Sequence, residues 1–349
     1  MFEKELTGLE YISKHTGNSP DLVQGGGGNT SAKLNDELMA IKASGFKINQ
    51  VTSREGYVVV RYNKLLDYYN SVDLKLDKDY EKEIGEFVKA NTVELEGVKK
   101  LRPSVEVGFH SFLKKYVIHS HSVYANIVCC SKEGKELADK IFKPNDFDYI
   151  WIPEVNPGFY STMSIKNKIT EYKKTTGRFP SVILMENHGL IVSANKAECA
   201  VELHNKANLY IKDHLNIKEQ YPEIVLEEIG DNKFRSETLF VQEFIKANKI
   251  DKDFFEQYAL YPDQLVYLND SISFGDKNAK LYIDSKNNEL IYSTGFNEAL
   301  TIEETLTAYL YVINGICTNN LSVKPMNESS IKFIRNWEGE SYRKKVSQG

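Results

Sequence analysis

Three histidines carry the most chemically informative pattern in this sequence. His119 and His121 lie two residues apart in the segment VIHSHSVYANIV, and His188 lies in VILMENHGLIV. The aromatic and β-branched residues at 116–118 favour a strand, on which an i, i+2 pair places both imidazoles on one face. A third imidazole from a second apolar run, with no nearby cysteine pair, predicts a catalytic zinc site with an open coordination position.

The alternative for this triplet is that paired strand histidines simply line a polar cavity. The remaining histidines stand at helical or surface spacing without an evident partner and are interpreted as structural; they are His15, His110, His204 and His214. Cys129 and Cys130 are adjacent, whereas Cys199 and Cys317 are remote, so no CxxC motif exists. This pattern predicts buried thiols in a reducing compartment.

A run of four glycines, Gly25–Gly28, opens the segment QGGGGNTSAKL. Such a run can be a flexible linker, but linker composition does not follow it, and neither nucleotide-binding fingerprint fits. The alternative is a tight turn at Gly28 whose backbone N–H groups, the Asn29 amide and the Ser31 hydroxyl close around an anionic or polyhydroxyl ligand. Both interpretations stay open.

Ser104 and Glu106 precede the histidine strand, at the start of a helix predicted over RPSVEVGFHSFLKKY. They can be an N-cap and a first-turn acid that stabilise the helix. They can equally be part of an anion site and a proton-transfer group beside the metal. The Ser44-Gly45 pair is ordinary turn chemistry when taken alone.

The composition fits a globular protein of one large or two smaller domains. The 349 residues are 41% hydrophobic and 27% charged, and the net charge of −5 indicates no nucleic-acid partner. The charged start and the lack of about 18 consecutive apolar residues predict no membrane span, and hence a cytoplasmic protein.

The elements mix strands and helices without a regular βαβ repeat. We therefore expect an α/β chain of α+β type, whose central, mainly antiparallel sheet is flanked by helices in layers. A change of character near residue 215 predicts a zinc domain over 1–215 and a smaller α+β extension over 216–349. This extension could equally pack onto the first domain as part of it.

Several local predictions concern that extension. The segments LVYLN (265–269), AKLYID (279–284) and ELIYS (289–293) are expected to be strands, the last two joined in a hairpin through residues 285–288. The segment from Thr301 to Glu304 has the pattern of a capping box that opens a helix to about residue 314. A charged helix is expected over NWEGESYRKKV (336–346).

Taken in order, the Gly-rich turn, the Ser-Gly turn, Ser-x-Glu, His-x-His and Asn-His-Gly resemble the class II aldolase/adducin family over about residues 5–215. That family includes zinc enzymes such as fuculose-phosphate and rhamnulose-phosphate aldolases and ribulose-phosphate 4-epimerase. The segments YPDQLVYLN, GFNEALTIEE and NWEGESYR look like the extension of longer members, including the aldolase half of rhamnulose-phosphate aldolase/dehydrogenase fusions.

The resemblance implies roles for individual residues. His119, His121 and His188 match the family's zinc ligands, with Mn²⁺ or Co²⁺ as alternative metals, and Glu106 matches the acid that exchanges a proton with the substrate. The groups that hold the substrate phosphate correspond to Asn29, Ser44, Gly45 and Ser104. Val105 replaces a family serine and removes one phosphate donor, so it stays open whether the substrate is phosphorylated.

The function implied is that of an aldehyde-lyase, which cleaves or forms a C–C bond of a ketose or ketose phosphate through a metal-stabilised enediolate. Epimerases, dehydratases and decarboxylases of the family share this type of intermediate. A different alternative is an adducin-like binding module, but such members lack the metal ligands. The resemblance also implies a homotetramer with active sites at subunit interfaces, where a neighbour supplies a tyrosine that cannot be chosen among 21.

Overall fold

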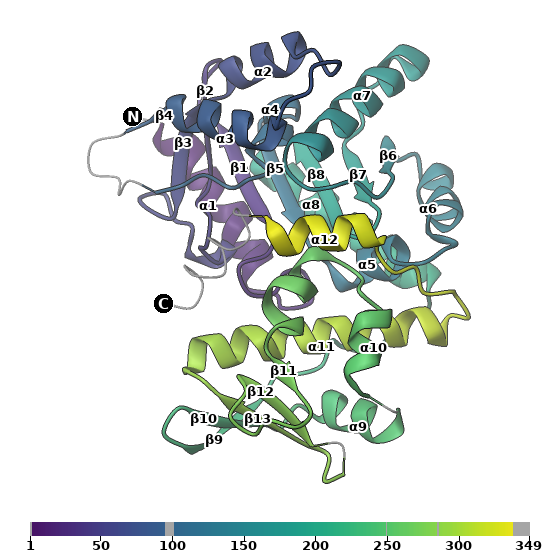
Figure 1. Cartoon of the computed structure of the whole chain (residues 1–349). Coiled ribbons are helices and arrows are strands. Elements are labelled where there is room, and N and C mark those ends of the chain that lie inside the picture. The colour runs from purple at the N-terminus through teal and green to yellow at the C-terminus, as the bar shows by residue number, and fades with distance from the viewer. Residues whose placement is uncertain (1, 95–100, 249, 285, 338–349) are drawn as a thin grey trace.

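The computed structural model describes residues 2–94, 101–248, 250–284 and 286–337. An eight-stranded sheet flanked by helices forms the larger part, and a five-stranded sheet lies further along the chain (Figure 1). The long helix α11 (Phe296–Thr318) runs between these two parts (Figure 1). The mixed α+β class is as predicted.

The larger sheet has the strand order β4-β3-β2-β1-β5-β8-β7-β6. All neighbouring pairs are antiparallel except β6 and β7, which are parallel, so the prediction of a mainly antiparallel sheet is confirmed. Its strands are β1 (Asn29–Lys33), β2 (Leu38–Lys42), β3 (Tyr57–Arg61), β4 (Thr92–Val93), β5 (Tyr116–Ser120), β6 (Tyr149–Ile152), β7 (Val182–Met185) and β8 (Gly189–Ala194).

Helices cover both faces of this sheet, which explains why strands such as β3 (YVVVR) and β7 (VILM) are nearly continuous apolar runs. Ile118 and Val192 belong to the hydrophobic cluster with α1, α5 and α8, whereas the next residues, Val117 and Ile191, belong to the cluster with α4 and α7. The helices of this part are α1 (Glu3–Gly17), α2 (Tyr62–Ser71), α3 (Tyr80–Ala90), α4 (Val107–Phe112), α5 (Val123–Cys129), α6 (Gly134–Phe142), α7 (Phe159–Thr176) and α8 (Ala197–His214), with the short helices η1 (Ile48–Gln50) and η2 (Lys143–Asn145).

The smaller sheet has the order β11-β12-β13-β10-β9. Its predicted hairpin is confirmed, because β12 and β13 pair antiparallel up to Asp284 and Glu289, and Asn288 has the positive φ of 56° that such a turn uses. This part contains β9 (Leu226–Gly230), β10 (Lys233–Ser236), α9 (Leu239–Ala247), α10 (Lys252–Gln257), the π-helix η3 (Gln264–Asn269), β11 (Ile272–Ser273), β12 (Leu281–Asp284), β13 (Glu289–Ser293) and α12 (Glu328–Asn336).

Four local predictions are wrong. Two of the four cysteines predicted to be buried, Cys199 in α8 and Cys317 in α11, are exposed, because their positions on these helices face away from the core. The segment 265–269 lies in the π-helix η3, because Gln264–Leu268 are all buried and a run buried on every side has no periodicity to separate strand from helix. The helix α11 begins at Phe296, so Thr301 lies inside the helix and opens nothing. The helix α4 begins at Val107, with Glu106 rather than Ser104 at its N-cap. The helix predicted over 336–346 lies almost wholly outside the described residues.

The two parts share one hydrophobic core. Its main cluster joins Leu9 of α1, Ile127 of α5 and Ile316 of α11. Gly315 lets α11 approach α5 closely, since a Cβ there would collide with the Ile127 side chain. The division near residue 215 stays a proposal, and the shared core favours an extension packed onto the first part.

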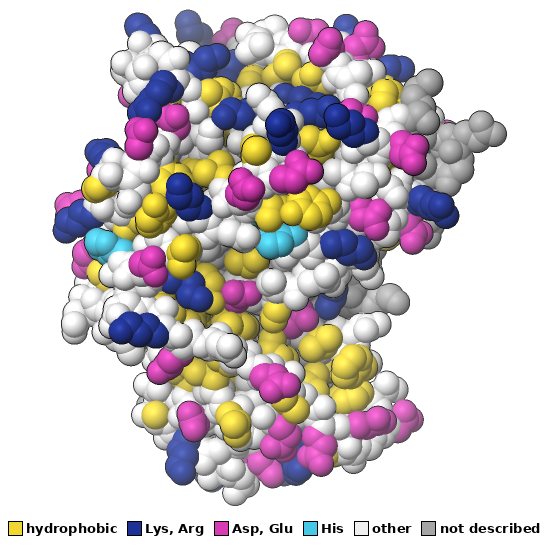
Figure 2. All heavy atoms as spheres, turned by 180° about the vertical axis from the view of Figure 1, so that it is seen from behind, with side chains coloured by type: hydrophobic (Ala, Val, Ile, Leu, Met, Phe, Trp, Pro, Cys, Tyr) yellow, Lys and Arg dark blue, Asp and Glu magenta, His cyan; other side chains and the backbone are white. Residues whose placement is uncertain are grey.

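Within the described ranges, no helix combines the length and apolar character that a membrane span needs. Figure 2 shows Lys and Arg side chains intermixed with Asp and Glu on the face opposite to that of Figure 1. This mixture agrees with the small net charge of −5.

Candidate metal centre

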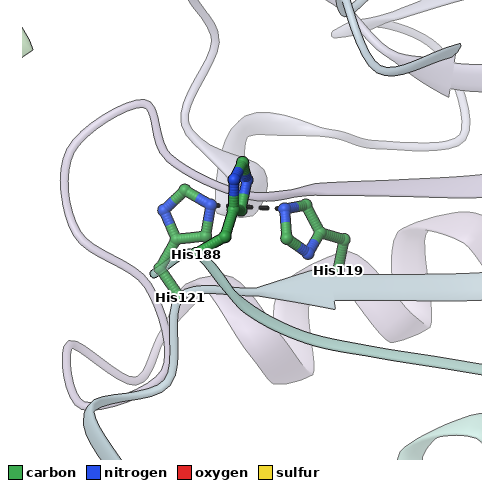
Figure 3. A group of neighbouring side chains, drawn as sticks. All are labelled: His119, His121 and His188. Atoms are coloured by element: carbon green, nitrogen blue, oxygen red, sulfur yellow. Dashed lines mark hydrogen bonds between the residues drawn. The ribbon is translucent and has the colours of Figure 1, made fainter. Parts of the chain in front are cut away.

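The three predicted histidines converge at one end of the strands of the larger sheet. His119 lies near the end of β5, His121 follows that strand, and His188 lies in the turn between β7 and β8, which pairs with β5 (Figure 3). One ring nitrogen of each histidine lies within 4.8 Å of the other two, and all three side chains are buried. The Nε2 atoms of His119 and His121 are 3.3 Å apart.

The hydrogen bonds behind these rings fix their tautomers. Nδ1 of His119 lies 3.2 Å from the carbonyl oxygen of Leu190, and Nδ1 of His121 is bonded to the carboxylate of Asp263. Because both partners only accept, the neutral form of each ring carries its proton on Nδ1 and turns the lone pair of Nε2 inwards. Two lone pairs facing each other repel, and a cation between them removes that repulsion.

Glu106 adds a carboxylate to the same point. Its Oε1 lies 3.1 Å from Nε2 of His188, and its Oε2 lies 3.5 Å from Nε2 of His119. The amide Nδ2 of Asn29 donates to Oε2 over 2.6 Å, whereas Oε1 is buried and has no hydrogen-bond donor among the described residues. An oxygen in this position could serve as a further ligand or as a base beside a metal ion.

The electrostatics of the pair Glu106 and His119 agree with that role. Burial lowers the pKa of His119 well below its usual value, against the raising effect of Glu106, so this imidazole is neutral. Burial raises the pKa of Glu106, but His119 and His188 outweigh burial and hold that pKa well below its usual range. A neutral His119 stabilises the carboxylate less than a charged one would, and a bound cation would add to that stabilisation. Three imidazoles and a carboxylate are a suitable donor set for a divalent transition metal.

A small cavity of about 20 Å³ lies beside these groups. Its lining brings together the following predicted residues: Gly28, Asn29, Ser44, Ser104, Glu106, His121 and His188. Three other predicted residues, His119, Ser31 and Gly45, are not in this lining. His119 is fully buried, the Ser31 hydroxyl lies 2.7 Å from Nδ1 of His110, and Gly45 forms a turn with φ of 86°. The volume suffices for an ion or a water molecule.

The glycine run is an ordered turn, so its interpretation as a linker is wrong. The N–H of Gly25 donates to Glu304 over 2.9 Å, and that of Gly27 donates to the carbonyl of Gln24 over 3.0 Å. A Cβ on Gly27 would collide with the Asp263 carboxylate, and one on Gly28, where φ is 59°, would collide with the carbonyl oxygen of His119. These close approaches give a physical reason for the glycines that needs no bound ligand.

Sequence reasoning missed His110 as a partner of the site. His110 is fully buried, its Nε2 is bonded to Oδ1 of Asn29, and burial lowers its pKa to about 3. The neutral ring receives the Ser31 hydroxyl on Nδ1 and donates from Nε2, which turns the Asn29 amide nitrogen towards Glu106. Its position one helical turn after Glu106 was a usable signal.

Lys42 and Asp263 were also missed. Lys42 ends β2, lines the cavity and donates from Nζ to the carbonyl oxygens of Phe46 (2.7 Å) and Gly26 (3.3 Å). Its spacing of two residues from Ser44 could have indicated a shared face. Nothing near Asp263 in the sequence points to His121, because 142 positions separate the two residues.

The chain is similar to known proteins over more than half of its length. Residues 11–208 match a family model described as the class II aldolase and adducin N-terminal domain. The uncharacterized oxidoreductase YuxG of Bacillus subtilis (strain 168) is 26% identical over 232 residues, which cover 62% of this chain and 31% of that protein. The chain thus spans about a third of that relative's length.

Two solved structures match about three fifths of the chain. The N-terminal class II aldolase domain of a conserved protein from Thermoplasma acidophilum is 24% identical, with a TM-score of 0.48, and the match covers 60% of this chain and 92% of that one. An L-fuculose-1-phosphate aldolase from Thermus thermophilus is 12% identical, with a TM-score of 0.38 and coverage of 62% and 97%.

Proposed function

Because that family model matches more than half of its residues, the chain belongs to the class II aldolase and adducin family, and we propose that it is a zinc-dependent aldolase. The proposed reaction cleaves or forms a C–C bond of a ketose or ketose phosphate. The observation that carries the proposal is the convergence of three buried imidazoles and one carboxylate on a single point.

His119, His121 and His188 would hold the metal, the first two through Nε2. Three neutral nitrogen ligands suit zinc with an open position, although Mn²⁺ or Co²⁺ would also accept them. A bound metal supplies a Lewis acid that stabilises negative charge developing on substrate oxygens.

Glu106 is the proposed proton-transfer residue. Its carboxylate is oriented by Asn29 and reaches the same point as the three imidazoles, so it lies beside any substrate carbon presented there. A positioned carboxylate of this kind exchanges a proton with the enediolate that the substrate forms, in either direction of the aldol reaction.

The cavity lining favours a substrate with an anionic end. Ser44 and Ser104 offer hydroxyl donors, and the buried Lys42 adds a positive charge where Val105 supplies no hydroxyl. We therefore propose a ketose phosphate as the substrate. It needs far more room than about 20 Å³, so the lining must open when it enters.

A donor screen tests this function. Dihydroxyacetone phosphate, dihydroxyacetone and pyruvate are each offered with a panel of aldehydes to the zinc-loaded full chain, and C–C bond formation is followed by mass spectrometry. We expect product with dihydroxyacetone phosphate above all. Product only from unphosphorylated donors would contradict the phosphate assignment, and no product from any donor with zinc bound would contradict the aldolase.

The assembly and location are part of the same proposal. We expect a cytoplasmic homotetramer whose active sites lie at subunit interfaces and receive a tyrosine from a neighbour. Native mass spectrometry of the purified chain measures the assembly directly, and a monomer that is fully active would contradict a shared site.

A further inference from the structure

The C-terminal part of the chain contacts the candidate metal centre at three places. The Asp263 carboxylate bonds Nδ1 of His121, and Glu304 accepts from the N–H of Gly25 over 2.9 Å. Asn187 is next to His188. Its Nδ2 donates to two backbone carbonyl oxygens of the C-terminal part, those of Leu260 (2.9 Å) and Lys324 (2.7 Å). The family match ends at residue 208, so these contacts come from outside the matched region.

Asp263 is the most direct of these contacts. It precedes the π-helix η3, its side chain is fully buried, and its carboxylate lies over Gly27, where no Cβ fits. A carboxylate bonded to the far nitrogen of a metal-binding imidazole fixes the tautomer and the ring orientation and makes the near nitrogen a stronger ligand. Removing it leaves the His121 ring free to rotate or to carry its proton on Nε2.

We propose that Asp263 is a positioning residue of the metal centre, supplied from the C-terminal part of the same chain. The glycine at position 27 leaves the space in which its carboxylate reaches His121. The C-terminal part therefore completes the metal centre. This inference rests on the metal-binding part of the proposed function.

The test is the zinc affinity of the full chain carrying Asp263→Asn, measured by competition with a chromogenic chelator. We expect affinity to fall by about 10- to 100-fold relative to wild type, as for other partners of metal-bound histidines. Glu303→Gln is the matched control, because Glu303 is also fully buried in the C-terminal part but bonds Ser236 and Tyr292 rather than a histidine. The control should bind zinc as the wild type does.

A second variant and a spectroscopic measurement guard against misfolding. Gly27→Ala would place a Cβ against both the Asp263 carboxylate and Nδ1 of His121, so it should also lower zinc affinity if the contact between these two groups matters. In the zinc-loaded wild type with ¹⁵N-labelled histidine, we expect the His121 proton on Nδ1 and the metal on Nε2, a readout that needs no folded variant.

The outcomes separate this inference from the proposed function. Unchanged zinc affinity in Asp263→Asn, equal losses in Asp263→Asn and Glu303→Gln, or zinc on Nδ1 of His121 would each overturn the role of Asp263 while leaving the metal centre standing. A wild-type chain that binds no divalent metal would overturn both.

Discussion

Two buried carboxylates, one in each part of the chain, show what distinguishes a functional acid from a structural one. Glu303 in α11 is enclosed by hydroxyl donors: Ser236 lies 2.7 Å from its Oε1, and the Tyr292 hydroxyl bonds its Oε2. Glu106 faces imidazole nitrogens, and only one of its oxygens receives a hydrogen bond from the described residues. A buried carboxylate whose oxygens both accept hydrogen bonds is typical of a structural group. A buried carboxylate oxygen that faces the lone pairs of imidazole nitrogens indicates a site for a cation.

The pKa values of the two carboxyls are shifted in opposite directions. Burial raises the pKa of Glu303, and its hydrogen bonds lower it without restoring the usual value. Burial also raises the pKa of Glu106, but the neighbouring histidines hold it well below its usual range. The comparison therefore predicts that replacing each carboxylate by the isosteric amide impairs catalysis at Glu106 but not at Glu303.

The largest expected effect is that of Glu106→Gln on catalysis. Loss of the proton-transfer group should lower kcat by about 10²- to 10⁴-fold while zinc stays bound, because the three imidazoles are untouched. Steady-state kinetics and metal analysis on the same sample measure both quantities. Glu303→Gln should keep wild-type kcat, and a similar fall in both variants would remove the distinction between the two acids.

A smaller effect is expected in the pH dependence of stability. Because the folded pKa of Glu303 is raised, its contribution is fully present below the unfolded value of about 4.3 and is lost as pH rises through the folded pKa. Glu303→Gln should therefore gain free energy of unfolding relative to wild type as pH rises from about 4.3, by up to about 1.4 kcal/mol per pH unit. Urea denaturation at several pH values measures it, and parallel profiles would contradict the raised pKa.

The smallest expected effect is on the free energy of unfolding, and it concerns Glu304, a partly buried carboxylate that has both a charged partner and a backbone donor. Glu304 pairs with Lys47 over 3.5 Å, with side chains 17% and 26% exposed, and it also accepts from the Gly25 N–H. Lys47→Met leaves that backbone contact in place and should cost at most about 1 kcal/mol of unfolding free energy. The exposed pair of Lys252 and Glu256 offers the control Lys252→Met, which should cost less still. A larger loss in the control would mean that partial burial adds nothing here.

Much of the larger sheet and of its histidine site could be predicted from local patterns. The β-branched run before His119, the i, i+2 spacing to His121 and the turn at His188 are all features of short segments, and the structure brings these residues together. The hairpin through residues 285–288 is local in the same sense.

Predictions failed where burial on all sides or distant contacts decide the structure. Residues 265–269 have no exposed face, so their pattern could not distinguish a strand from the π-helix. The contacts of Asp263 with His121 and of Glu304 with Gly25 join residues more than a hundred positions apart, which no periodicity encodes. The glycine run, by contrast, is evident in the sequence. The reason why these positions must be glycine is the close approach of distant residues, which the sequence does not show.

The central claim is that His119, His121 and His188 form one divalent metal site. The most direct test is titration of the dialysed, metal-free full chain with Zn²⁺, followed by native mass spectrometry. We predict one ion per wild-type chain and none in His119→Ala under the same conditions, while His204→Ala, which changes a buried histidine bonded to Ser120 outside the cluster, still binds one. A wild-type chain that takes up no ion, or a His119→Ala chain that still takes up one, would contradict the account.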